Sequence, residues 1–236
     1  MRLVLFTAII FFVFTINGQI LSSNANSPLL LKNSQLGEKR IELIESAFLE
    51  LPNNTQVAFG FINSDSTWYL GCLKIDKEVF VIQNSDSVFE IGSLSKVFTA
   101  SMLSQLAIEQ KLKLSDKVSK YTPFKIPSKI TFLQLANHTS GLPRLPANFF
   151  FTMKEMDNPY KFYMESDFES YMKEIDVETP NSVSDYSNTG YGILGYVIGQ
   201  VEKKNYEEIL TTRFCQPLGL KSTTLNIEVI QKDLVK

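Results

Sequence analysis

The stretch "FEIGSLSKVFTASMLSQLAIEQ", residues 89–110, joins an apolar run typical of a strand to an apolar run with helical spacing. Its junction carries Ser93, Ser95 and Lys96 directly after Gly92. A serine at that point could cap the helix, because its oxygen can accept a free backbone N–H of the first turn. Alternatively, Ser93 and Lys96 are three residues apart, so they share one helix face and lie close enough for chemistry.

The segments around this junction predict a sheet first and helices afterwards. Residues 55–64 and 67–75 are rich in β-branched and aromatic residues, which predicts a β-hairpin, and residues 78–83 form a third strand candidate. Helices are predicted over residues 35–51, from near Ser93 onward, and over residues 130–136, 166–175, 190–203 and 205–217. The helix that begins near Ser93 has an apolar stripe, formed by Val97, Met102, Leu103, Leu106 and Ala107. The helix over residues 166–175 begins with a capping box at Ser166 and Glu169. This order favours an α/β (α+β) protein in which an antiparallel sheet packs with a helical region.

Composition excludes some classes of function. The 236 residues are 44% hydrophobic and 20% charged, typical of a globular protein with a buried core. Because 23 basic and 25 acidic residues are interspersed, we expect no nucleic-acid partner. The two cysteines, Cys72 and Cys215, have apolar neighbours and are expected to be buried free thiols, although pairing is possible after export. With His138 as the sole histidine and no His-Glu-x-x-His sequence, no metal site is expected.

The N-terminus has the pattern of a secretory signal. Arg2 precedes an apolar run over residues 3–16, which is shorter than the ~20 residues of a membrane span. We expect a signal peptide over residues 1–18, with cleavage as late as Ala25, followed by a domain over residues 35–236. The alternative is an uncleaved anchor. The prediction is therefore export to the periplasm or medium, without a stable membrane partner.

The pattern Ser-x-x-Lys occurs twice, and its context separates the two copies. Ser170 and Lys173 lie within a predicted helix among charged residues, as expected for a solvated face. Ser93 instead begins a helix, where free N–H groups and the helix dipole stabilise negative charge. A neutral Lys96 on the same face could accept the serine proton.

A second candidate motif is Tyr186-Ser187-Asn188, the only Tyr-x-Asn in the chain, just before an apolar glycine-rich run. Tyrosine can relay protons, and asparagine can donate to a substrate carbonyl. Ser, Asp and Asn are also typical turn residues, so a structural turn is the alternative.

Together these motifs resemble the serine penicillin-recognising family of class C β-lactamases, D-alanyl-D-alanine peptidases and related esterases. Residues 89–96, "FEIGSLSK", resemble the class C active-site signature over all eight positions. Residues 133–143, "LQLANHTSGLP", are similar to the family's His-Thr-Ser-Gly-Leu-Pro segment, and residues 186–195 to its second catalytic motif. The resemblance extends from about Gln35 to the end of the chain.

The resemblance implies a β-lactamase/transpeptidase-like fold and a cofactor-free serine hydrolase of the class C type, acting on small-molecule β-lactams. Ser93 would form an acyl-enzyme, with its backbone N–H as one oxyanion donor. Lys96 and Tyr186 would form the proton-transfer pair, and the sequence leaves open which of the two is the base. Asn188 would hold Lys96 and the substrate amide, whereas His138 would be structural. The alternatives are a peptidase or esterase acting on peptidoglycan peptides or small esters, and a non-turnover penicillin-binding or interaction module.

Two departures from the family pattern matter. Where class C enzymes have a glutamine after Gly-Leu-Pro, this chain has Arg144-Leu145, which weighs against efficient β-lactam turnover more than against acyl chemistry. The third motif, Lys-Thr-Gly or His-x-Gly on a strand, is absent before Lys236. We therefore expect an incomplete sheet with unpaired edges, in a C-terminally truncated chain that is poorly active and aggregation-prone alone, and monomeric at full length.

Overall fold

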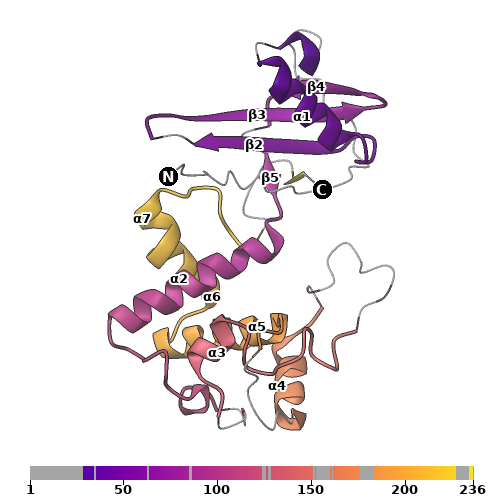
Figure 1. Cartoon of the computed structure of the whole chain (residues 1–236). Helices are drawn as coiled ribbons and strands as arrows, with labels where there is room; N and C mark the ends of the chain where they lie inside the picture. Colours follow the sequence, from indigo (N-terminus) through magenta and orange to yellow (C-terminus); the bar gives the residue numbers. More distant parts are fainter. Residues whose placement is uncertain are drawn as a thin grey trace. The chain divides into compact units, whose positions relative to one another are not determined.

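The computed structural model describes residues 29–34, 36–62, 64–84, 87–123, 126, 129–150, 152, 160, 162–175, 183–226 and 234–235 (Figure 1). They form two compact units, one up to Gly92 and again from Asn226 onward, the other from Ser93 to Leu225. The expected signal segment lies outside the described residues. Within the described ranges, the search for a helix with the length and apolar character of a membrane span finds none.

The first unit contains a four-stranded antiparallel sheet with the strand order β1-β4-β3-β2. The predicted hairpin is confirmed, and the predicted third strand pairs with its second arm. The strands are β1 (Leu29–Leu30), β2 (Gln56–Ile62), β3 (Thr67–Ile75) and β4 (Glu78–Ile82). Two further short strands, β5 (Val88–Phe89) and β6 (Leu234–Val235), pair in parallel.

The core of this unit lies between the sheet and helix α1 (Glu38–Phe48), which Figure 1 shows against the sheet. The helix buries Ile44 and Phe48 because they are four residues apart and share one face. The core residues are Leu31, Ile44, Phe48, Val57, Leu70, Cys72 and Val79. Cys72 is a free, buried thiol, and burial raises the pKa of this thiol to about 12.

The second unit is helical and has its own core. Its helices are α2 (Ser95–Ile108), α3 (Phe132–Ala136), α4 (Glu165–Glu174), α5 (Asn188–Glu202), α6 (Tyr206–Leu210) and α7 (Gln216–Leu218), with 3₁₀ helices η2 (Gly92–Leu94) and η3 (Val118–Lys120) and a π-helical segment, η5 (Thr211–Cys215). Cys215 is free and buried in this core.

Helices α2 and α5 pack together and thereby position the residues at their N-termini. Met102, Leu103 and Leu106 on α2 share one buried cluster with apolar residues of α5, Ile193, Leu194, Val197 and Ile198. The α2 residue Thr99 also forms a hydroxyl–hydroxyl hydrogen bond of 2.5 Å with Tyr206. The predicted apolar stripe is therefore confirmed from Met102 onward. Val97 does not belong to it, because its side chain is 60% exposed.

Helix caps agree with the sequence in one place and differ in another. The helix predicted from residue 205 is capped by Asn205, whose side-chain oxygen accepts the Glu208 N–H at 2.8 Å. The capping box at Ser166 is wrong, because α4 begins at Glu165. There the Asp167 carboxylate accepts the Met164 N–H at 2.9 Å, so an acidic residue two positions earlier than expected satisfies the first turn.

A charged cluster joins the C-terminal end of α5 to two neighbouring segments. The Glu202 side chain is 8% exposed, and its two oxygens contact Lys111 at 2.8 Å and Arg213 at 2.6 Å. Both cations also contact Glu109. Burial alone would raise the pKa of Glu202, but its hydrogen bonds to Lys111 and Arg213 outweigh this and lower it.

We expect Glu202→Gln to lower the free energy of unfolding by about 1–2 kcal/mol at pH 7, because two charge-assisted hydrogen bonds weaken. Since the folded-state pKa is lowered, the carboxylate contributes stability above its unfolded pKa, about 4.3, and the contribution is lost as pH falls through the folded value. Urea unfolding of both proteins between pH 3 and 7 measures this difference.

The matched control is Glu208→Gln. Glu208 forms an exposed i,i+4 ion pair with Lys204, which is worth less than about 0.5 kcal/mol. Equal destabilisation by the two substitutions, or a Glu202→Gln effect that does not shrink toward pH 3, would contradict this account of the cluster.

Candidate active site

Ser93 lies in the 3₁₀ turn η2, two residues before the first residue of α2, and its side chain is exposed. The capping interpretation fails for this serine, because Leu94 occupies the N-cap position of α2 and no side chain caps the helix. Instead, the Ser93 Oγ lies 2.6 Å from the hydroxyl of Tyr186, and either atom can donate. The Lys96 Nζ donates to the same Ser93 Oγ at 3.3 Å.

Lys96 lies one turn beyond Ser93 on the same helix face, as its spacing requires. Its ammonium also donates to the Asn188 Oδ1 at 2.8 Å and lies 4.9 Å from the centroid of the Tyr186 ring. The four residues predicted from sequence, Ser93, Lys96, Tyr186 and Asn188, therefore form one contiguous cluster of contacts within the second unit.

The Tyr186-Ser187-Asn188 segment forms the start of helix α5 rather than the turn that its composition also allowed. Ser187 is structural, since its Oγ accepts the Gly190 N–H at 2.9 Å and so caps α5. Tyr186 precedes this cap and Asn188 is the first residue of the helix. The cap thus fixes the backbone from which the two flanking side chains reach Ser93 and Lys96.

A second segment, residues 137–144, fastens this backbone in place. The Asp185 N–H donates to the carbonyl of His138 at 2.7 Å, and the Ser187 hydroxyl donates to the carbonyl of Pro143 at 2.7 Å. The Asn188 N–H donates to the carbonyl of Arg144 at 2.9 Å. The stretch that contains His-Thr-Ser-Gly-Leu-Pro therefore positions the Tyr-Ser-Asn motif through main-chain hydrogen bonds.

His138 has a structural position, as its sequence context predicts. Its backbone has a φ of 63°, and its Nδ1 accepts the Ser187 N–H at 3.1 Å. Burial, together with the charge of Lys96, lowers the pKa of His138, which favours the neutral ring that an acceptor Nδ1 requires. The ring packs 4.6 Å from that of Tyr186.

Tyr186 has the electrostatic environment of a proton-transfer group. Burial would raise the pKa of this phenol, but interactions with Lys96 and Ser93 and the charge of Arg144 together lower it. A phenol with a lowered pKa, in contact with a hydroxyl, can take the proton that leaves this hydroxyl when its oxygen attacks a carbonyl.

Two residues at the site were not singled out as functional from the sequence. The Asn188 Nδ2 donates to the hydroxyl of Tyr160 at 3.4 Å, and Tyr160 packs against Phe149 with ring centroids 5.1 Å apart. Arg144 places its guanidinium carbon 5.1 Å from the centroid of the Tyr186 ring. The departure from the family glutamine marked Arg144 as unusual, but no sequence signal marked Tyr160.

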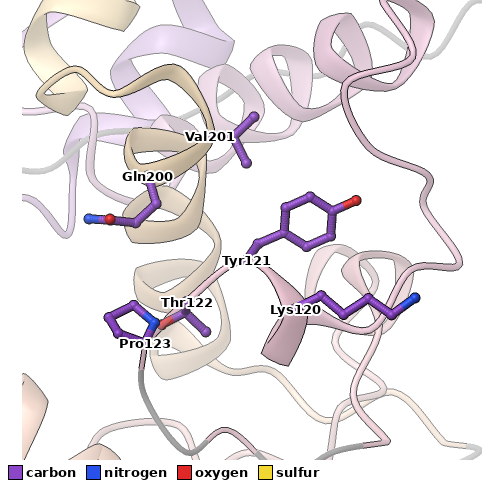
Figure 2. Close-up of a pocket in the computed structure, with 6 residues that line it drawn as sticks. All are labelled: Lys120, Tyr121, Thr122, Pro123, Gln200 and Val201. Atoms are coloured by element: carbon purple, nitrogen blue, oxygen red, sulfur yellow. The ribbon is translucent and has the colours of Figure 1, made fainter.

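Other candidates lie apart from this cluster. Ser170 and Lys173, the second Ser-x-x-Lys pair, are both exposed on α4. Within the described ranges, no three His, Cys, Asp or Glu side chains are grouped as a metal site would require. Figure 2 shows a pocket of about 340 Å³ between the segment after η3 and the end of α5, lined by Lys120, Tyr121, Thr122, Pro123, Gln200 and Val201. It contains none of the four clustered residues.

The chain is similar to known proteins over much of its length. The family model described as Beta-lactamase matches residues 57–234. The D-alanyl-D-alanine-carboxypeptidase/endopeptidase AmpH of Escherichia coli (strain K12) is 31% identical over 150 residues, 59% of this chain and 37% of that protein. A β-lactamase of Pseudomonas fluorescens is 32% identical over 152 residues, 63% of this chain and 40% of that protein.

A solved structure shares the fold. The β-lactamase/D-alanine carboxypeptidase from Yersinia pestis complexed with citrate superposes with a TM-score of 0.60 at 27% identity, over 72% of this chain and 50% of that one. The chain thus spans half or less of the length of these relatives. The β-lactamase/transpeptidase-like α+β fold expected from the sequence is confirmed, and because the family model matches most of the chain, the protein belongs to the Beta-lactamase family.

Proposed function

We propose that the protein is a serine hydrolase of the class C β-lactamase type, in which Ser93 is acylated by β-lactam amides. The observation that carries the proposal is the simultaneous contact of the Ser93 Oγ with the Tyr186 hydroxyl and the Lys96 ammonium. A serine is a weak nucleophile at neutral pH unless an adjacent group takes its proton, and here two candidate groups touch it.

In the proposed reaction, the Ser93 Oγ attacks the lactam carbonyl carbon while its proton passes to the Tyr186–Lys96 pair. The C–N bond of the tetrahedral intermediate then breaks, and the pair returns the proton to the departing nitrogen. An ester to Ser93 remains, and water hydrolyses it to release a carboxylate and regenerate the hydroxyl. Asn188 keeps the Lys96 ammonium oriented through its Oδ1. In the proposed complex its Nδ2, which here donates to the Tyr160 hydroxyl, donates to the carbonyl oxygen of the substrate's side-chain amide.

A second candidate function is a D-alanyl-D-alanine carboxypeptidase or an esterase with the same nucleophile. Two observations favour it. One named relative is a carboxypeptidase/endopeptidase. In addition, Arg144-Leu145 stand in the segment where class C enzymes have a glutamine, and the Arg144 guanidinium contacts Tyr186. Acylation of Ser93 is common to both candidates, so the two candidates differ in the substrate that acylates it.

The experiment that separates the candidates measures turnover of a chromogenic cephalosporin, a panel of short esters and a peptide ending in D-alanyl-D-alanine. The β-lactamase proposal predicts steady cephalosporin hydrolysis. Rapid cleavage of esters or of the peptide, with no cephalosporin turnover, would overturn it in favour of the second candidate. Reaction of one equivalent of the chromogenic cephalosporin per protein, without further turnover, would indicate a penicillin-binding module.

We also propose that the protein is exported, on the strength of the charged and apolar pattern over residues 1–18. Protein recovered outside the cytoplasm should have Gln19 as its N-terminal residue, after cleavage at Gly18, or Asn26, after cleavage at Ala25, as measured by N-terminal sequencing. Exported material that begins at Met1 would contradict cleavage.

A further inference from the structure

Arg144 has an unusual position for an exposed cation. Its guanidinium carbon lies 5.1 Å from the centroid of the Tyr186 ring, within the range of a cation–π contact. Among the residues that the structure describes, no carboxylate forms an ion pair with Arg144. Its charge is therefore not neutralised by a described partner and acts on the ring beside it.

The main chain of Arg144 fixes where this side chain begins. Its carbonyl accepts the N–H of Asn188 at 2.9 Å and that of Thr189 at 3.3 Å, at the start of α5. The adjacent Pro143 carbonyl accepts the Ser187 hydroxyl. Because these bonds join the backbone of Arg144 to the Tyr-Ser-Asn segment, its side chain starts beside Tyr186 whichever residue occupies the position.

The other groups that face Tyr186 define the balance of charge on the phenol. Lys96 is the second cation, 4.9 Å from the ring centroid, and the Ser93 hydroxyl lies 2.6 Å from the phenol oxygen. The His138 ring packs against Tyr186 and is neutral when its Nδ1 accepts a hydrogen bond. The His138 ring also packs against the ring of Tyr191, and the centroids of these two rings are 5.1 Å apart. Among the residues that the structure describes, Arg144 and Lys96 are thus the cations in contact with the ring.

A cation beside a phenol stabilises the phenolate relative to the neutral form, so it lowers the pKa of the phenol. The charge of Arg144 contributes to the lowered pKa of Tyr186 in this way, behind the contributions of Lys96 and Ser93. Unlike a lysine, the guanidinium remains charged at every pH at which the protein is folded, so its effect on the ring does not titrate.

We infer that Arg144 is a positioning residue that acts through Tyr186 and sets the pH range over which Ser93 is acylated. This inference rests on the proposed function. Its consequence is that the acid limb of the acylation profile lies at lower pH than it would with a neutral residue at this position.

The test measures acylation of the protein by a neutral ester and by an ester that carries a carboxylate, from pH 5 to 9. We expect Arg144→Gln to move the acid limb upward by about one pH unit with both esters, about tenfold in rate at a fixed acidic pH. Arg144→Lys should recover most of the shift. Because Arg144 is exposed, 1 M salt should shrink the difference between wild type and Arg144→Gln.

The matched control is Arg40→Gln, which removes the same charge from an exposed position on α1 and should leave the profile unchanged. An Arg144→Gln profile that superposes on the wild type would overturn the inference. A fall in acylation rate that occurs only with the ester carrying a carboxylate would also overturn the inference, because Arg144 would then bind substrate directly.

A second readout does not depend on activity. In protein with ¹³Cζ-labelled tyrosine, the resonance assigned to Tyr186 by its loss in Tyr186→Phe should titrate at higher pH in Arg144→Gln. If no ester acylates the wild type, the proposed function fails, yet this titration still decides the inference about Arg144. An unchanged Tyr186 titration would overturn the inference even if acylation at Ser93 is established.

Discussion

Replacing Ser93 with alanine is expected to slow ester or cephalosporin cleavage by a factor on the order of 10⁶, the scale seen when the nucleophile of a serine protease is removed. The reason is that the Ser93 Oγ is the oxygen on which Tyr186 and Lys96 converge. Alanine removes this oxygen and one hydrogen-bond partner from each of the two side chains. Because Ser93 is exposed, stability should change little.

The chain offers a matched control for this substitution. Ser170 begins the second Ser-x-x-Lys sequence and is exposed on α4. Ser170→Ala should retain wild-type rates in the same assay. Residual catalysis by Ser93→Ala above a few per cent of wild type, or an equal loss in Ser170→Ala, would show that the nucleophile has been assigned to the wrong serine.

For Lys96→Ala, we expect acylation to slow by about 10²–10⁴-fold, the contribution typical of general acid–base catalysis. The substitution removes the donor that contacts both the Ser93 Oγ and the Asn188 Oδ1. It also removes a cation from the Tyr186 ring, so the phenol loses part of the interaction that lowers its pKa. Single-turnover acylation, rather than steady-state turnover, is the appropriate measurement because it isolates the first step.

Lys173→Ala is the control for the lysine, since Lys173 is exposed on the same helix as Ser170. It should acylate at the wild-type rate. If Lys96→Ala were acylated as fast as wild type, Lys96 would have no part in proton transfer, and Tyr186 alone would remain as the base.

The sequence predicted those parts of the fold in which a local pattern has one structural solution. The hairpin of β2 and β3 has two runs of β-forming residues separated by a short polar turn, and its register follows from that turn. Strand β1 has only two residues, so no periodicity could reveal it. Strand β6 pairs in parallel with β5 across a long sequence separation, which no local pattern encodes.

The errors have the same origin. Val97 has the spacing of the apolar stripe on α2, yet spacing alone cannot show where that stripe leaves the core. At α4, both Ser166 and Asp167 are good capping residues, and local chemistry does not decide between helix starts that differ by two residues.

At the site, the residues found from sequence belong to recognisable short motifs, whereas the missed residues act through three-dimensional proximity. Ser93, in the 3₁₀ turn that leads into α2, and Lys96, in the first turn of α2, are three residues apart, so their contact follows from their spacing. Tyr160 reaches Asn188 from a position 28 residues away in sequence, and nothing in its neighbours predicts that contact. Arg144 likewise meets Tyr186 only because main-chain hydrogen bonds join their segments.

The central claim is that Ser93 is the acylated nucleophile, and the most direct test is to locate the adduct that a penicillin leaves on the protein. Opening the lactam ring expels no fragment, so intact mass should rise by one whole penicillin. After trypsin digestion, the adduct should lie on the peptide that runs from Glu78 to Lys96, and fragmentation should place it on Ser93 rather than on Ser85, Ser87 or Ser95. An adduct on any other residue, or one that persists in Ser93→Ala, would contradict the account.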